Sequence, residues 1–222
     1  MSNLHGFVQQ SSVARASDGT SVGIRATRDG ALVQVPWIQA LCLEGRGFGT
    51  FHSAADLDAT SVGTFGAGAI DADEFDWHLA VPDTAAVLPI FIQVSYSAIG
   101  TILTYGLTCA WGTGSAVSNG LALTEFNLRP GSSNASVCTA TGITDDGGTA
   151  LTETGFFWNV SKLGVTPTAT QVELLVPPYS AATSAFVPVI EGARQVVAWT
   201  PGQAGTGSIM AQWIELPIAA IR

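Results

Sequence analysis

The sequence predicts an all-β domain, an antiparallel β-sandwich of jelly-roll type with short irregular segments and little or no helix. Three observations predict it. Apolar residues recur with a period of two or in short runs, turn-forming residues separate these runs, and roughly ten to thirteen runs follow one another at sandwich spacing. No stretch has the length of a crossover helix, which excludes a parallel α/β sheet. An up-and-down barrel is the second choice.

The first predicted element is a hairpin formed by residues 21–27 and 31–35. Asp29 and Gly30 lie between them, and this step favours a tight turn because both residues tolerate a positive φ. Residues 37–44 could form a short helix, but their leucines alternate equally well with smaller residues. We therefore predict a strand or an irregular segment there.

The centre of the chain carries the longest strand candidates. Residues 75–81 alternate in period two. The residues predicted to share one face of this strand are Phe75, Trp77, Leu79 and Val81. Residues 87–96 and 101–111 are rich in β-branched and aromatic side chains. They predict two long central strands joined by a tight connection.

The C-terminal half continues the pattern. Shorter strand candidates lie at 121–128, 135–141, 154–161, 171–176 and 186–190, with a clear turn at 144–149. Residues 194–200 and 208–216 flank a glycine-rich segment, and we predict that they form a closing hairpin. The length fits one domain, so we expect a single jelly-roll-like domain over 1–222, with 1–20 as a candidate arm that contacts neighbouring subunits.

Charged residues are scarce and unbalanced. They make up 11% of the chain, against about 25% in an ordinary soluble domain. Either other chains cover part of the surface or Ser, Thr, Asn and Gln dress it. There are 17 acidic and 8 basic residues, and the arginines are scattered, so we expect no nucleic-acid partner. No apolar run approaches the ~20 residues that span a bilayer, so we expect no membrane partner.

Residues typical of catalysis or metal binding do not form a recognisable site. The histidines and cysteines lack zinc spacing; they are His5, His52, His78, Cys42, Cys109 and Cys138. We interpret His78 as an exposed strand residue, and Cys42 and Cys109 as buried thiols, although one disulfide remains open. The acidic segment 71–76 could hold Ca²⁺ but lacks an EF-hand glycine and terminal glutamate. We therefore predict no catalytic residue, no cofactor, no metal and no enzymatic activity.

The six tryptophans divide into two groups. Those inside alternating apolar runs predict core positions; they are Trp77, Trp111, Trp199 and Trp213. Trp37 follows a proline and Trp158 follows two phenylalanines, which constrains them less. We expect these two to make subunit contacts, where aromatic residues are enriched. The predicted interface residues are Trp37, Arg46, Arg129 and Trp158.

Segments at both ends of the chain resemble jelly-roll decoration (cement) proteins of tailed bacteriophages. They are residues 28–37, 40–46, 186–190 and 212–217, the last reading Gln-Trp-Ile-Glu-Leu-Pro. The resemblance implies a virion protein on the outer capsid surface, a homotrimer that binds a major capsid protein and stabilises the shell. Two alternatives stay open: a carbohydrate- or receptor-binding module, such as a fibre head or adhesin, and a jelly-roll capsid subunit proper.

Overall fold

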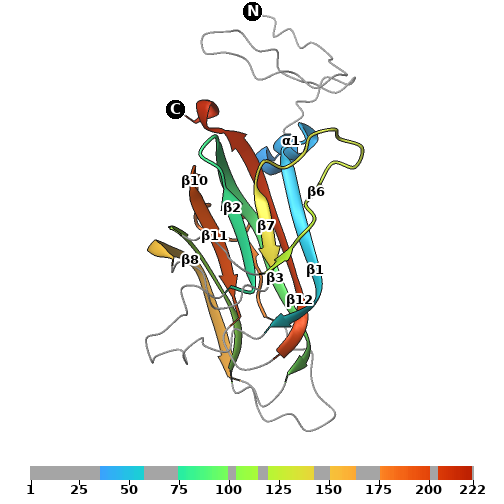
Figure 1. Ribbon diagram of the computed structural model, residues 1–222, viewed down its shortest axis with the longest axis vertical. Helices are drawn as coiled ribbons and strands as arrows, with labels where there is room; N and C mark the ends of the chain where they lie inside the picture. Colours follow the sequence, from blue (N-terminus) through green and yellow to red (C-terminus); the bar gives the residue numbers. More distant parts are fainter. Residues whose placement is uncertain are drawn as a thin grey trace, which may run out of the picture.

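A computed structural model describes residues 36–57, 75–99, 104–114, 120–142, 151–163, 176–200 and 205–221. These residues form two antiparallel sheets packed face to face, which confirms the predicted all-β sandwich (Figure 1). The predicted hairpin at 21–35, the candidate arm and the turn at 144–149 lie outside the described residues. So does all of the predicted strand at 171–176 except Val176, and no structural statement is made about any of these.

The described strands divide equally between the sheets. Sheet one contains β1 (Gly47–Leu57), β3 (Ala85–Ile99), β6 (Phe126–Asn127), β9 (Tyr179–Ser180), β10 (Ile190–Glu191) and β12 (Gly205–Pro217). Sheet two contains β2 (Trp77–Val81), β4 (Thr104–Thr113), β5 (Leu121–Ala122), β7 (Thr139–Gly142), β8 (Thr152–Leu163) and β11 (Arg194–Trp199). One α-helix, α1 (Trp37–Leu43), and a 3-10 turn, η1 (Ile218–Ala220), lie at the same end of the sandwich (Figure 1).

The pairing of strands is nested from the two ends of the described chain. β1 pairs with β12, β2 with β11, β3 with both β10 and β9, and β4 with β8, all antiparallel. Each of the first four strands lies in the sheet opposite to the one before it. The long ladders therefore join residues that are far apart in the sequence.

The prediction that residues 194–200 and 208–216 close the fold as a hairpin is wrong. β11 lies in sheet two between β2 and β4, and β12 lies in sheet one between β1 and β3. Each strand already has a partner along both edges, so neither can pair with the other. The same separation applies to the predicted central strands 87–96 and 101–111, which form β3 and β4 but belong to different sheets.

Other strand predictions are confirmed in part. Residues 154–161 lie in β8, and the end of 135–141 forms β7. The predicted strand 121–128 is broken into β5 and β6, which belong to different sheets. Of residues 186–190 only Ile190 enters a strand. β1 was not predicted, because its glycines resemble those of a loop.

The prediction that residues 37–44 form a strand or irregular segment is wrong, since α1 occupies them. Ile38, Leu41 and Cys42 follow helical spacing and pack on Ile214 and Leu216 of β12. The helix thus covers one end of the outer side of sheet one.

The space between the sheets is filled by a large apolar cluster. Trp77 and Trp213 are at most 2% exposed and lie 6.1 Å apart between ring centroids, as predicted for core residues. Trp199 is equally buried but belongs to a second cluster, on the outer side of sheet two. Phe75 joins that second cluster, so its predicted place beside Trp77 is wrong. Trp111 is half-buried, under the guanidinium of Arg194.

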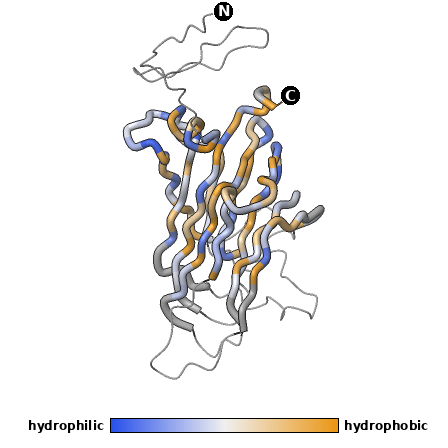
Figure 2. The backbone as a smooth tube through the Cα atoms, turned by 180° about the vertical axis from the view of Figure 1, so that it is seen from behind, coloured by the Kyte–Doolittle hydropathy of each residue, from blue (hydrophilic) through white to orange (hydrophobic). Residues whose placement is uncertain are grey.

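The long strands alternate between inward apolar and outward residues, and Figure 2 shows this alternation in the hydropathy along the chain.

Cys109 and Cys138 are buried and Cys42 is half-buried in α1, and all three are free thiols. Burial raises the pKa of each of these thiols. None is poised to react as a thiolate, since a raised pKa keeps the thiol protonated.

The interpretation of His78 as an exposed residue is wrong. Its side chain points away from Trp77, as period two requires, but it is only 3% exposed and stacks on Phe75 at 5.9 Å between ring centroids. The outer side of sheet two is covered there by the second apolar cluster. Burial lowers the pKa of His78 to about 4.

Because burial favours the neutral form of His78, we expect the folded protein to lose stability in acid. The unfolded chain takes up a proton near pH ~6.5 and the folded chain only near pH 4, so the free energy of unfolding falls as the pH drops through this window. The fall amounts to about 3 kcal/mol for this group. Urea unfolding between about pH 7 and pH 4 measures it. In His78→Phe the fall should be smaller; an equally steep fall in the variant would contradict the assignment.

A second prediction concerns the buried bond from Trp77 Nε1 to Thr50 Oγ1, 3.0 Å long. Thr50→Val keeps the shape of the side chain but leaves the indole N–H without its acceptor, so the free energy of unfolding should fall by about 1–3 kcal/mol. The matched control is Thr50→Ser, which retains the hydroxyl and should cost less. Chemical unfolding of the three proteins makes the comparison, and a larger loss in the serine variant would contradict it.

Candidate interaction site

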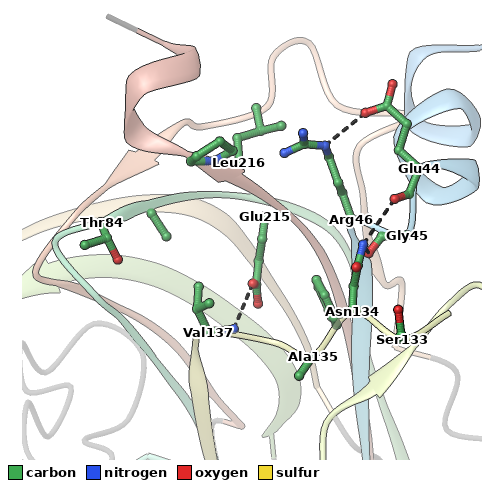
Figure 3. A pocket seen from close by; sticks show the side chains of 13 residues that line it. Glu44, Gly45, Arg46, Thr84, Ser133, Asn134, Ala135, Val137, Glu215 and Leu216 are labelled. Carbon is green, nitrogen blue, oxygen red and sulfur yellow. Dashed lines mark hydrogen bonds and ion pairs between the residues drawn. The ribbon is translucent and has the colours of Figure 1, made fainter. Parts of the chain in front are cut away.

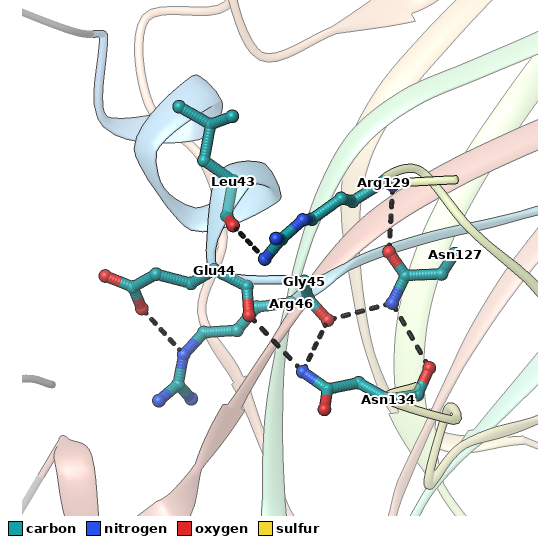
Figure 4. Close-up of polar contacts among 7 residues, drawn as sticks. All are labelled: Leu43, Glu44, Gly45, Arg46, Asn127, Arg129 and Asn134. Atoms are coloured by element: carbon teal, nitrogen blue, oxygen red, sulfur yellow. Dashed lines mark hydrogen bonds and ion pairs between the residues drawn. The ribbon is translucent and has the colours of Figure 1, made fainter. Parts of the chain in front are cut away.

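The end of α1 forms a corner that side chains from the segment after β6 hold in place. A helix leaves its last carbonyl groups without intrahelical partners. Arg129 Nη1 donates to the carbonyl oxygen of Leu43 at 2.8 Å, and Asn134 Nδ2 donates to that of Glu44 at 3.3 Å (Figure 4). These side chains replace the missing partners, so the helix end is fixed to the sandwich.

Gly45 allows the chain to turn from α1 into β1. Its φ is +74°, a left-handed conformation that glycine adopts without strain. A Cβ atom here would also lie 2.5 Å from Ser132 Oγ. The carbonyl oxygen of Gly45 accepts from Asn127 Nδ2 at 2.9 Å and from Asn134 Nδ2 at 3.2 Å. The two asparagines therefore meet at one backbone carbonyl group.

An open pocket of about 800 Å³ lies beside this corner (Figure 3). Its walls come from the corner, the turn before β3, the segment before β7 and the end of β12. The lining residues are Glu44, Gly45, Arg46, Phe48, Thr84, Ala85, Ser133, Asn134, Ala135, Val137, Glu215, Leu216 and Pro217. No histidine or cysteine is among the described residues that line it.

Glu215 is a buried carboxylate in the wall of this pocket, 7% exposed. It accepts from Ser136 Oγ at 2.5 Å, from the backbone N–H of Val137 at 3.0 Å and from Trp213 Nε1 at 2.8 Å. Three donors compensate for the water that the carboxylate loses on burial. Its negative charge also adds to burial in raising the pKa of Cys138. Glu215 thus ties β12 to the segment before β7.

Arg46 contributes the positive charge of the pocket. Its Nε donates to Glu44 Oε2 at 2.9 Å, and both side chains are about a third exposed. An ion pair this exposed adds little to stability. The pocket therefore carries charges of both signs, with two carboxylates and one guanidinium, and no excess of basic charge for an anion. Among the described residues, no group of three or more His, Cys, Asp or Glu could hold a metal ion.

The structure places two of the four predicted interface residues, Arg46 and Arg129, at the α1 corner and a third, Trp37, at the other end of the same helix. Trp37 begins the helix and is 46% exposed, Arg46 follows it, and Arg129 bonds its last turn. Trp158 lies apart in β8 of sheet two, where it is half-buried and meets Tyr179 edge-on at 6.0 Å. That these residues contact other subunits stays a prediction.

One exposed apolar surface was not predicted from the sequence. Phe51 of β1 and Phe126 of β6 are 55% and 42% exposed on the outer side of sheet one. The alternation along β1 could have revealed Phe51. Phe48, Thr50 and His52 point inward and are buried, so the residues between them point outward. Glycines at alternate positions masked this alternation.

Comparison of the chain with protein-family models, curated proteins and solved structures found no match. Neither helix in the described part of the chain is long and apolar enough to cross a membrane.

The corner yields a stability prediction at Asn127. Asn127→Asp keeps the acceptor for the Arg129 N–H but replaces the Nδ2 donor by a carboxylate oxygen that faces the carbonyl oxygen of Gly45. The free energy of unfolding should fall by about 1–3 kcal/mol, and the amides of α1 should exchange faster with solvent. Asn159→Asp on exposed β8 adds the same charge and should change stability by less than about 0.5 kcal/mol. Equal losses in both variants would contradict a role of the Asn127 amide in holding the corner.

Proposed function

We propose that this chain is a structural subunit of a virus particle that decorates and stabilises a phage capsid as a homo-oligomer, a trimer by resemblance. One observation carries the proposal: large hydrophobic side chains are exposed at many places on a chain that has few charges. Those between 42% and 68% exposed are Trp37, Leu43, Phe51, Leu121, Phe126, Val137, Phe156, Phe186 and Val189. Exposed apolar side chains on a chain with so few charges support the proposal that other chains cover part of its surface.

The order of strand pairing supports the jelly-roll part of the proposal. In a jelly roll the chain folds as one long antiparallel ribbon wrapped into two sheets, so early strands pair with late ones. The pairs β1 with β12, β2 with β11, β3 with β10 and β4 with β8 follow that order. An up-and-down barrel would instead pair each strand with the next.

The stabilising effect would come from buried area repeated by symmetry. A standard protein interface buries about 1,600 Å² in total, and only part of the corresponding free energy is realised as affinity. When many identical copies bind one shell, the small free energies of the individual contacts add together. The exposed α1 corner, with its apolar residues and charges of both signs, suits contact with another protein better than contact with phosphate groups.

Heating particles with and without the chain tests the proposal. Particles that lack it should release their genome at a lower temperature, measured by a dye that fluoresces on the released nucleic acid, and added purified chain should restore the release temperature. An unchanged release temperature contradicts a stabilising role. Images of the particles separate the alternatives, because a shell that fails to close without the chain identifies a capsid subunit proper.

A further inference from the structure

The outer side of sheet one presents three rows of side chains, set by the strand register. The first row crosses β6, β1, β12 and β3 and contains Phe126, Gly49, Gln212 and Phe91. The second contains Phe51, Met210 and Gln93, and the third Ser208 and Ser95. These nine residues are called the outer face. None of them is charged.

Gly49 allows the aromatic side chain of Phe126 to lie close to the sheet on the outer face. A Cβ atom at Gly49 would lie 3.1 Å from ring atoms of Phe126, so the ring of the edge strand lies close over β1. Phe51 stands beside it, one position along the same side of β1. Phe91 and Met210 are partly exposed on the neighbouring strands. Together they form an apolar surface flanked by amides and hydroxyls.

Part of this side of sheet one is already covered within the chain. Ile214 and Leu216 of β12 continue the outward series of Met210 and Gln212, and they are buried under α1. The helix is only 7 residues long and packs on this end of the sheet. The outer face is the continuation of the same side beyond α1, and there Phe51 is 55% exposed.

We propose that the outer face binds another copy of this chain. The chain carries a net charge of −9, so two copies repel each other wherever their acidic residues approach. An uncharged face lets them meet without desolvating charge. Its polar groups can pair with the same groups on a second copy, because the side-chain amides of Gln93 and Gln212 each donate and accept hydrogen bonds. This deepens the proposed function, on which it rests for the expectation of a homo-oligomer.

The size of the outer face predicts a weak contact. Strands about 4.8 Å apart and rows about 6.8 Å apart give each position about 33 Å², so the nine positions cover roughly 300 Å² per copy. That is less than half of the ~800 Å² that each partner buries in a standard interface. The contact should therefore be concentration-dependent in dilute protein and become strong only where symmetry repeats it.

Sedimentation of the purified chain over a range of concentrations tests the proposal. The informative variants are Phe51→Glu and Phe51→Lys, which place opposite charges at the same exposed position. Each should raise the dissociation constant of self-association by about tenfold or more, because a charge would be buried against an apolar partner surface. The matched controls are Phe156→Glu and Phe156→Lys in sheet two, where the phenylalanine is also 55% exposed. Thermal unfolding confirms that each variant is folded.

Three outcomes would overturn the proposal. One is a wild-type chain that stays monomeric up to about 1 mM. Another is an equal effect of the Phe51 and Phe156 variants. The third is tighter association of Phe51→Lys, which would mean that net charge rather than burial at this face controls the contact. The heating experiment on particles is read separately: a chain that stabilises particles but fails these tests keeps the proposed function and loses this interface.

Discussion

β12 is the strand on which the rest of the structure depends. It pairs with β1 and β3 along almost its whole length and so holds together both halves of sheet one. Its inward residues include Trp213, which packs on Trp77 of sheet two. Its outward residue Ile214 lies under α1, and Glu215 bonds the segment before β7. One strand thus links the core, the helix and the pocket wall.

The nested pairing has a consequence for folding as well as for shape. Most contacts in the sandwich join distant parts of the chain, and each requires the closure of a long loop before it gains any free energy. A late strand such as β12 must therefore find its place between β1 and β3 before sheet one exists. Local turn signals do not encode which distant strands pair. The prediction of a hairpin failed at β11 and β12 for this reason, because these two strands follow each other in the sequence but lie in different sheets.

The sequence predicted the class of fold, most long strands and the burial of three tryptophans, because burial on a sheet leaves a period-two pattern. It did not predict which sheet a strand joins, since that depends on edges that other strands occupy. α1 was missed because 7 residues carry too few turns to separate helical from alternating spacing. His78 was misjudged because the cluster that covers it combines the nearby Phe75 with residues from other strands. At the site, Arg46 and Arg129 both bond residues at the end of α1, which the sequence did not reveal, and the outer face depends on strand register alone.

Charge and apolar surface occupy unusual places in this molecule. The carboxylate of Asp76 is 3% exposed and accepts from the backbone N–H and hydroxyl of Thr200, and buried Glu215 accepts from three donors. Buried charges need such fixed partners, so these two carboxylates contribute to connecting segments rather than to solubility. Meanwhile Phe51 and Phe126 stand outside. Buried carboxylates and exposed aromatic rings together support the proposed assembled state over a free monomer.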